Sequence, residues 1–187
     1  MKNNTCTLVF LDMDDVLCLD NVHHSGIMLK IFKQEILDYP ELWERIVDAS
    51  AADNLRQLDV EFNPAYVISS SWATYLDKEK MCQALNRMQL QFVVESLHVE
   101  WRTPRALSSS RRDEIEWWLE AHREPCQPFI IIDDSWSGTG LAYSPLAGNG
   151  HIILCKSGLG FTKKRLQEAR RQLKRQGAVC RDIPLEQ

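Results

Sequence analysis

Apolar and polar residues follow one another along this chain in blocks that have two different periods. Short runs of large apolar residues, bounded by turn residues or acidic residues, lie at residues 7–12, 65–70, 129–134 and 151–156, with 91–96 as a shorter fifth. Uninterrupted runs of this length are typical of strands that are buried on both faces of a sheet. The pattern therefore predicts five strands.

The segments between these runs carry apolar residues at helical spacing. They lie from Pro40 to about Leu58, at 77–88, at 111–123 and from about Thr162 to Gln176. Proline at a first helical position, the capping sequence SRRD at 110–113 and Gly177 after the last segment support these limits. Strands that alternate with helices predict an α/β fold, in which a parallel sheet with right-handed crossovers is flanked by helices.

The chain shows no internal repeat and no clear linker, so we expect a single domain over residues 1–187. The gap between the first two predicted strands, residues 16–64, is longer than one crossover helix needs. Residues 16–39 are therefore expected to form a small insertion, a flap or cap beside the end of the first strand. Residues 135–150 contain four glycines and are expected to form a turn-rich loop.

Composition narrows the class of protein. The 187 residues are 44% apolar and 26% charged, with a net charge of −4, which is ordinary for a globular protein. The acidic balance argues against a protein devoted wholly to nucleic acid, and no apolar run reaches membrane-spanning length. The N-terminus lacks a secretory pattern and the six cysteines contain no C-x-x-C pair, which predicts reduced thiols and a cytoplasmic setting.

Polar residues suited to metal and phosphate chemistry follow three of the predicted strands. They are Asp12 and Asp14 after the first, Ser69, Ser70 and Ser71 after the second, and Asp133 and Asp134 after a later one. The carboxyl ends of parallel strands meet at one edge of a sheet, where ligands bind. Carboxylates crowded there repel one another unless a cation joins them, and hard oxygen ligands favour Mg²⁺.

This arrangement predicts a mechanism of phosphoryl transfer. Asp12 is the candidate nucleophile, which would attack phosphorus and form an aspartyl-phosphate. Asp14, two residues further on, is the candidate general acid, which would protonate the leaving group and later activate water. Mg²⁺ and a nearby cation would neutralise charge on the transferring group.

Three stretches, FLDMDDVL, YVISSS and FIIIDD, carry a family resemblance. They are similar to the first (D-x-D-x-[TV]), second and fourth motifs of the haloacid dehalogenase (HAD) superfamily, in the right order over about residues 7–160. VISSSW, RRDEIEWWL and GLGFTKKRLQEA further resemble a bacterial subgroup of small HAD domains, some of them linked to RNA-repair proteins. The resemblance implies a Rossmann-like core, phosphatase rather than dehalogenase chemistry, and Mg²⁺ held by Asp12, Asp14, Asp133 and Asp134.

Two positions depart from the superfamily pattern. Asp15 stands where glycine is common, and its carboxylate either adjusts metal binding or faces solvent. The usual lysine of the third motif is absent, so Arg111 or Arg112 is the expected substitute, and Arg111 is preferred by position. Arginine stays charged and grips phosphate with two donors, so the exchange preserves the role.

Two further assignments are less direct. Ser69 is preferred over Ser70 as the phosphate ligand, although helix capping is a competing interpretation for the serines. The tryptophans, including Trp72 and Trp136 beside the expected site, are interpreted as packing residues rather than as platforms for substrate.

The last predicted helix, within 162–176, is strongly basic. Against the single acidic Glu168 it carries seven basic residues: Lys163, Lys164, Arg165, Arg170, Arg171, Lys174 and Arg175. In an acidic chain this suggests nucleic acid as a phosphate-rich partner. A solvated helix packed through Leu166, Ala169 and Leu173 is the favoured interpretation.

The leading hypothesis is an Mg²⁺-dependent phosphomonoester phosphatase that acts on a nucleotide or a nucleic-acid end. A phosphoprotein substrate is the enzymatic alternative. A module that binds phosphate and metal without turnover is the alternative from another class. Asp15 and the missing lysine favour that module, whereas the intact Asp12 and Asp14 argue against it.

Overall fold

The computed structural model describes residues 6–19, 24–34, 37 and 40–179. Its centre is a five-stranded parallel sheet in the order β3-β2-β1-β4-β5. The strands are β1 (Leu8–Leu11), β2 (Ala65–Ile68), β3 (Leu97–Arg102), β4 (Phe129–Asp134) and β5 (Ile152–Cys155). The chain thus has the predicted α/β, Rossmann-like architecture.

Ten helices are described. They are α1 (His24–Phe32), α2 (Pro40–Ile46), α3 (Ala49–Phe62), α4 (Trp72–Tyr75), α5 (Lys78–Arg87), α6 (Gln91–Glu95), α7 (Arg111–His122), α8 (Thr139–Ala142), α9 (Pro145–Gly148) and α10 (Lys163–Arg175). Several of the longer helices have side-chain N-caps. Asp77, Ser110 and Thr162 each accept a hydrogen bond from the first turn of the helix that follows.

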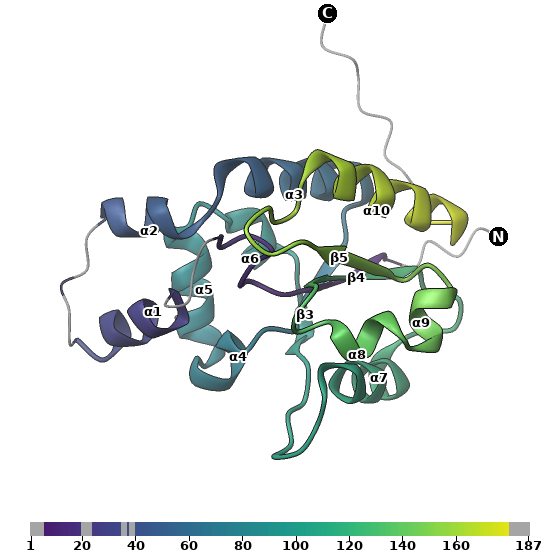
Figure 1. Ribbon diagram of the computed structural model, residues 1–187, viewed down its shortest axis with the longest axis horizontal. Helices are drawn as coiled ribbons and strands as arrows, with labels where there is room; N and C mark the ends of the chain where they lie inside the picture. Colours follow the sequence, from purple (N-terminus) through teal and green to yellow (C-terminus); the bar gives the residue numbers. More distant parts are fainter. Residues whose placement is uncertain (1–5, 20–23, 35–36, 38–39, 180–187) are drawn as a thin grey trace, which may run out of the picture.

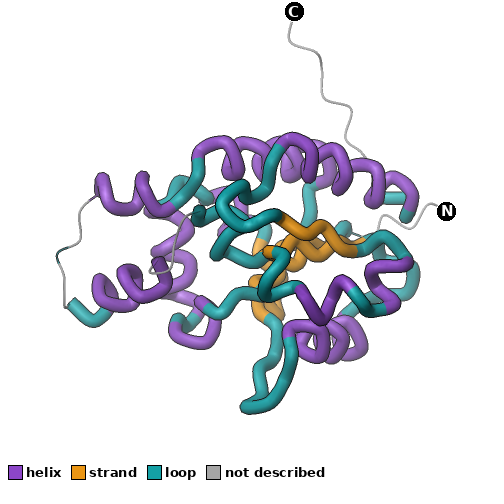
Figure 2. The backbone as a smooth tube through the Cα atoms, viewed as in Figure 1, coloured by secondary structure: helices purple, strands orange, loops and turns teal. Residues whose placement is uncertain are grey.

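The sheet lies between two layers of helices. In Figure 1, α3 and α10 run side by side over one face, while α7, α8 and α9 cover the other, and Figure 2 shows the short strands enclosed by helix. Successive side chains of β1 point to opposite faces: Val9 and Leu11 join the larger apolar cluster, Leu8 and Phe10 the smaller. Burial on both faces explains why the central strands are unbroken apolar runs in the sequence.

The fifth predicted strand is wrong in position. Residues 91–95 form α6, which buries Val93, and the strand follows at Leu97–Arg102. β3 lies at the edge of the sheet and pairs only with β2, so Val99 is 76% exposed. A half-solvated edge strand alternates apolar and polar residues instead of presenting an apolar run, so the run next to it was mistaken for the strand.

The helix expected from Pro40 to about Leu58 is two helices. The Asp48 side chain accepts a hydrogen bond from Ala51 N at 2.8 Å and caps α3, and its backbone N–H donates to Leu17 O at 2.7 Å. The apolar spacing continues through this break and hides it. The loop expected at 135–150 likewise contains two single-turn helices, α8 and α9.

The expected insertion at 16–39 has two parts. Val16, Leu17 and Cys18 are buried in the core, whereas α1 lies with α2 at the end of the sheet away from the N-terminus (Figure 1). Residues 20–23, 35–36 and 38–39 lie outside the described residues. That α1 forms a cap for the site stays a prediction.

Two expectations drawn from composition concern cysteines and membranes. Cys6, Cys18, Cys82, Cys126 and Cys155, the described cysteines, are all free thiols. Among the described helices, none combines the length and the apolar character that crossing a bilayer requires.

Candidate active site

The carboxyl ends of β1, β2 and β4 lie level with one another. Asp12 N donates to Ile132 O at 3.0 Å, and Ser69 N donates to Leu11 O at 2.9 Å, so the ladder continues one residue past β1 on each side. Alternation along the strands places Asp12 and Asp133 on the face that α7 covers. The sheet therefore brings the predicted acidic residues to one point beside the start of α7.

Arg111 is the first residue of α7 and faces these carboxylates. Ser110 and Asp113 form a reciprocal capping box that holds the helix start in place. The guanidinium lies 3.1 Å from Asp133 through Nε and 3.4 Å from Asp12 through Nη2. Arg111 thus occupies the place that its preference over Arg112 implied.

Arg112 points elsewhere. Its Nε donates to Glu116 one turn along α7 at 2.8 Å, and its side chain is 41% exposed, against 12% for Arg111. Two adjacent residues of a helix differ by about 100° in direction, so only one of the pair can face the sheet. The geometry favours Arg111 as the substitute for the superfamily lysine.

Three carboxylates form a candidate metal site. One oxygen from each of Asp12, Asp133 and Asp134 lies within 4.8 Å of the others, and all three residues are at most 3% exposed. Asp133 Oδ2 is buried without a well-directed hydrogen bond, although Arg111 Nε lies close to it. Three carboxylates against one guanidinium leave a negative surplus, and an all-oxygen donor set fits Mg²⁺.

Asp134 also stabilises the turn that follows β4. Its Oδ1 accepts hydrogen bonds from Trp136 N at 2.6 Å and Ser137 N at 3.0 Å. Asp133 Oδ1 accepts from Asp134 N at 2.9 Å. Each acid of the pair therefore keeps one oxygen for its local turn and has one left for the site.

Asp14 lies beside this trio, on the turn after β1, and is held by a different partner. The indole Nε1 of Trp72 is 3.1 Å from both of its carboxylate oxygens. Burial raises the pKa of Asp14 to about 6, although the Trp72 hydrogen bond works in the opposite direction. Such a pKa suits a group that must both give and take a proton near neutral pH.

Burial also raises the pKa of Asp12, to about 7, while Arg111 opposes this by favouring the carboxylate. The pKa of Asp133 is raised in the same way, by burial and by the charge of Asp12. For Arg111, burial works against the cation, but Asp12, Asp133 and Glu114 outweigh it and its pKa is raised. The pocket is therefore short of positive charge.

Asp15 lies outside the cluster of Asp12, Asp133 and Asp134 and is bound to a loop. Its carboxylate accepts from Ser157 Oγ at 2.8 Å and from Gly158 N at 3.0 Å, which ties the turn after β1 to the loop after β5. Its φ of 56° lies in the left-handed region, where glycine is the usual residue and aspartate is tolerated. This conformation explains why the superfamily often has glycine here.

The loop after β5 docks on the same turn at Gly160, whose φ is +61°. A Cβ on Gly160 would lie 2.7 Å from Val16 O and 2.6 Å from Leu19 Cδ2, so only glycine fits. Phe161 N donates to Val16 O at 2.9 Å, and Asn54 Nδ2 donates to Phe161 O at 2.8 Å.

The serines after β2 differ in access. Ser69 is fully buried and its Oγ has no hydrogen-bond partner. Ser70 Oγ accepts from Trp72 N at 3.3 Å, and a hydrogen bond from its side chain lowers the pKa of Asp12. Because the Ser70 hydroxyl reaches Asp12 whereas that of Ser69 is buried without a partner, the geometry favours Ser70 as the phosphate ligand over the preferred Ser69.

A cavity of about 220 Å³ opens in front of these groups. It is lined by Asp12, Asp14, Ser71, Arg105, Ser109, Arg111, Glu114 and Ser137. Sequence reasoning missed Arg105, Ser109, Glu114 and Ser137. Glu114 had a usable signal, because it lies three residues after Arg111 on a helix, whereas nothing in the loop sequence marks Arg105.

The two tryptophans near the site are unlike. Trp72 is fully buried, as the packing interpretation expects, and it also holds Asp14. Trp136 is 85% exposed, so the packing interpretation is wrong for this residue. It follows Asp134 by two positions, on a turn that projects from the strand end, where no second layer covers the side chain.

The basic helix α10 packs as the favoured interpretation expects. Leu166, Ala169 and Leu173 are fully buried. Arg165 pairs with Glu168 at 2.5 Å and Arg170 pairs with Glu61 of α3. The remaining five basic residues are exposed: Lys163, Lys164, Arg171, Lys174 and Arg175.

Comparison with known proteins agrees with this geometry. Residues 8–166 match the family described as "HAD domain in Swiss Army Knife RNA repair proteins". The chain belongs to this family. The membership confirms the HAD resemblance and supports a hydrolase of the HAD type.

Two other comparisons add little. No curated protein matches the chain. Among solved structures, it is similar to a hydrolase of the haloacid dehalogenase-like family from Streptococcus pneumoniae, with 12% identity, a TM-score of 0.41, and 89% of this chain and 91% of that chain covered. A likeness this distant carries no argument about the site.

Proposed function

We propose that this protein is an Mg²⁺-dependent phosphomonoester phosphatase that works through an aspartyl-phosphate on Asp12. One observation carries the proposal: Asp12 meets Asp133, Asp134 and Arg111 at the strand ends, with Asp14 beside them at a pKa of about 6. A purely structural cluster would not bury three carboxylates around a single cation, because the repulsion is uncompensated.

In the first half of the reaction, a carboxylate oxygen of Asp12 bonds to phosphorus while the bond from phosphorus to the ester oxygen breaks. Asp14 gives its proton to that ester oxygen, so an alcohol leaves. Arg111 donates to the phosphoryl oxygens from the start of α7, and Ser70 donates from the end of β2. Arg111 also favours the charged form of Asp12 that the attack needs.

In the second half, Asp14 is a carboxylate and takes a proton from water, whose oxygen attacks phosphorus. The bond between phosphorus and Asp12 breaks, inorganic phosphate leaves, and both aspartates return to their initial states. Trp72 keeps the Asp14 carboxylate directed at the site through both halves. Mg²⁺ held by Asp12, Asp133 and Asp134 would supply positive charge to the phosphoryl oxygens.

Asp15 and the missing lysine, the two features that favour a non-catalytic module, are both compatible with an enzyme. Asp15 clamps the loop after β5, and Arg111 stands where the missing lysine would act. An intact pair of Asp12 and Asp14 has no use in a module that only holds phosphate. The enzyme is therefore the better-supported hypothesis.

The substrate that we propose is a nucleotide or a nucleic-acid end. The exposed basic residues of α10 support a phosphate-rich substrate, and the open cavity beside Asp14 leaves room for a large leaving group. A phosphoprotein remains the competing substrate, which a substrate panel distinguishes.

The test is phosphate release from an aryl phosphate, with Mg²⁺ and then with EDTA. We expect release that needs Mg²⁺ and that Asp12→Asn lowers by about 10³-fold or more, with an unchanged circular dichroism spectrum. Asp53→Asn, an exposed aspartate of α3, is the matched control and should keep full activity. Full activity in Asp12→Asn would contradict the aspartyl-phosphate.

A panel then identifies the substrate. Nucleotides, oligonucleotides with 3′- or 5′-phosphate ends and phosphopeptides are compared by kcat/KM at equal Mg²⁺. Preference for the phosphopeptides would replace the nucleic-acid proposal by the phosphoprotein one.

A further inference from the structure

A second cavity adjoins the first. It has about 250 Å³ and is lined by Ser70, Ala73, Thr74, Arg102, Thr103, Pro104, Arg105 and Glu114. Arg105 and Glu114 line both cavities, whereas Ser71 lines the first and Ser70 the second. A substrate whose phosphate lies against Arg111 in the first cavity would therefore extend past Arg105 and Glu114 into the second cavity.

The second cavity carries a surplus of positive charge. Its ionisable residues are Arg102, Arg105 and Glu114, and the charge of Glu114 is divided between two arginines. Glu114 lies 3.6 Å from Arg105 Nε and 3.9 Å from Arg111 Nη1. Within the described part of the chain, no carboxylate forms a salt bridge with Arg102.

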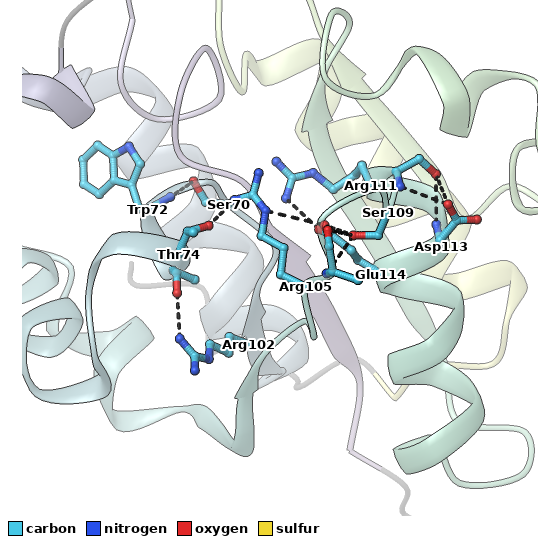
Figure 3. Close-up of polar contacts among 12 residues, drawn as sticks. Ser70, Trp72, Thr74, Arg102, Arg105, Ser109, Arg111, Asp113 and Glu114 are labelled. Carbon is cyan, nitrogen blue, oxygen red and sulfur yellow. Dashed lines mark hydrogen bonds and ion pairs between the residues drawn. The ribbon is translucent and has the colours of Figure 1, made fainter.

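Both arginines are positioned rather than loose. Arg102 donates to Ala73 O at 2.7 Å and lies over the Trp101 ring, with 5.2 Å from its Cζ to the ring centroid. Arg105 lines both cavities, donates to the Thr74 hydroxyl of α4 and pairs with Glu114 of α7 (Figure 3). Each guanidinium has five N–H donors, so donors are left over for a ligand.

Glu114 lies in the wall that the two cavities share. It is 4% exposed, accepts from Ser109 Oγ at 2.8 Å, and lies between Arg105 and Arg111 in Figure 3. A buried carboxylate that pairs with two arginines keeps both cations near it. The first cavity thus has Arg111, the second has Arg102, and Arg105 lines both.

We propose that the cavity formed by Arg102, Arg105 and Thr74 binds a second phosphate group of the substrate, so that the preferred substrate is a phosphomonoester that carries another phosphate close to the reacting one. This rests on the proposed function, because the first cavity must take the reacting phosphate. The second group is either a further phosphomonoester or the phosphodiester that follows the end of a nucleic-acid strand. Both present the same oxygens to the two arginines.

The experiment measures binding and turnover separately. Binding is measured by calorimetry on the Asp12→Asn protein with Mg²⁺, which cannot complete turnover. The probes are adenosine 5′-monophosphate, adenosine 3′-monophosphate, adenosine 3′,5′-bisphosphate and a 5′-phosphorylated diadenosine dinucleotide. Turnover of the same compounds and of an aryl phosphate is measured on the chain with Asp12 intact.

Each binding measurement is repeated with Arg102→Gln, with Arg105→Gln and with Arg56→Gln. Arg56 is a close match for Arg102, because it donates to Gln89 O at 3.1 Å and lies over the Phe92 ring at 4.7 Å, in another part of the surface. A loss of affinity that all three variants share would reflect reduced stability of the fold.

We expect at least one probe that carries two phosphate groups to bind about tenfold more tightly than both monophosphates, as one charge-assisted contact allows. Arg102→Gln and Arg105→Gln should remove that advantage, while Arg56→Gln keeps it. Arg102 lines only the second cavity, so Arg102→Gln should weaken the probes with two phosphate groups far more than the monophosphates, whereas Arg56→Gln should leave aryl phosphate turnover unchanged. An advantage confined to the bisphosphate or to the dinucleotide identifies which kind of second phosphate is taken.

Equal affinity for single and double phosphates would overturn the proposal. It would also be overturned if Arg102→Gln weakened the monophosphates as much as the bisphosphate. Failure of the proposed function would give a different result, because no compound would be turned over. The difference in affinity between the probes, and its loss in Arg102→Gln, would still show whether the second cavity binds a phosphate group.

Discussion

The two cavities are built from unlike parts of the fold. The first is lined by Asp12, whose carboxylate meets those of Asp133 and Asp134 at the strand ends. These three residues are at most 3% exposed, and the ladder of the sheet holds the backbone at Asp12. The second depends on Arg102 at the end of the edge strand and on Arg105 in the loop that follows, whose side chain is 47% exposed.

Under the proposed function, this difference assigns the chemistry to the first cavity and substrate selection to the second. Groups at the ends of central strands cannot move without breaking the sheet, which suits atoms that must meet phosphorus at a set distance. Groups on an edge strand and a loop can adapt to the rest of a substrate. We therefore expect changes in the first cavity to lower kcat, and changes in the second to raise KM.

The largest effect should come from Arg111, which lies against the carboxylates of Asp12 and Asp133. Arg111→Ala removes the charge beside Asp12 and Asp133, and we expect kcat/KM for an aryl phosphate to fall by about 10³-fold. Arg111→Lys should lose much less, since lysine is the superfamily's usual residue. Arg112→Ala is the neighbouring control, and a loss there as large as in Arg111→Ala would reverse the assignment.

The next effect concerns stability and pH. Burial raises the pKa values of Asp12 and Asp14 to about 7 and about 6, so near pH 5 the folded metal-free chain holds protons that the unfolded chain has lost. This contribution is complete below about pH 4 and is lost as pH rises through about 7, so the free energy of unfolding should fall by at least about 3 kcal/mol between these limits.

Urea unfolding in EDTA at several pH values measures this dependence. Asp12→Asn should flatten the decline, since the amide does not titrate, and Mg²⁺ should stabilise the chain most above pH 7. A stability that rises from pH 4 to pH 7 in Asp12→Asn and in the chain with Asp12 intact alike would show that other groups dominate.

A smaller effect should follow from uncoupling the two cavities. Glu114→Gln keeps the shape but removes the buried charge between Arg105 and Arg111, and we expect about 1–3 kcal/mol less stability in urea unfolding. Glu116→Gln, on the exposed side of the same helix, should change stability by less than about 0.5 kcal/mol. Equal effects at the two positions would mean that Glu114 does not link the arginines.

The smallest expected effect is a shift in the pH profile of kcat, and it tests the hydrogen bond from Trp72 to Asp14. Trp72→Phe removes the indole N–H that favours the charged carboxylate, so the pKa of Asp14 should rise further, by up to about one unit. The pH profile of kcat should shift to higher pH on its alkaline side, where Asp14 must stay protonated to act as an acid. An unshifted profile would separate Asp14 from the proton-transfer step.

Much of the first cavity could be predicted because its residues follow buried strands. Leu8–Leu11 and Phe129–Ile132 are apolar throughout, and the acids after them must lie at the sheet edge. Alternation could even have selected Asp133 as the partner of Arg111, because it shares a face with Phe129 and Ile131. The preference for Ser69 over Ser70 stays a prediction that the geometry does not favour, because the chain turns after β2 and the alternation ends there.

Little of the second cavity could be predicted. β3 is an edge strand, so its pattern is weak, and the loop after it contains Arg105 among residues with no periodicity. Arg105 and Thr74 are 31 residues apart in the chain, and Glu114 comes from a further helix, so the three meet only when the chain folds. No local rule links such residues.

The sequence by itself determined the layered α/β fold, the acidic strand ends and the family, because burial, alternation and turn chemistry act between near neighbours. The tertiary structure alone decided which arginine faces the acidic cluster, why Asp15 adopts a glycine-like conformation, and which arginines gather in the two cavities. Those outcomes depend on directions and distances between elements, which charge and packing settle only after the sheet has formed.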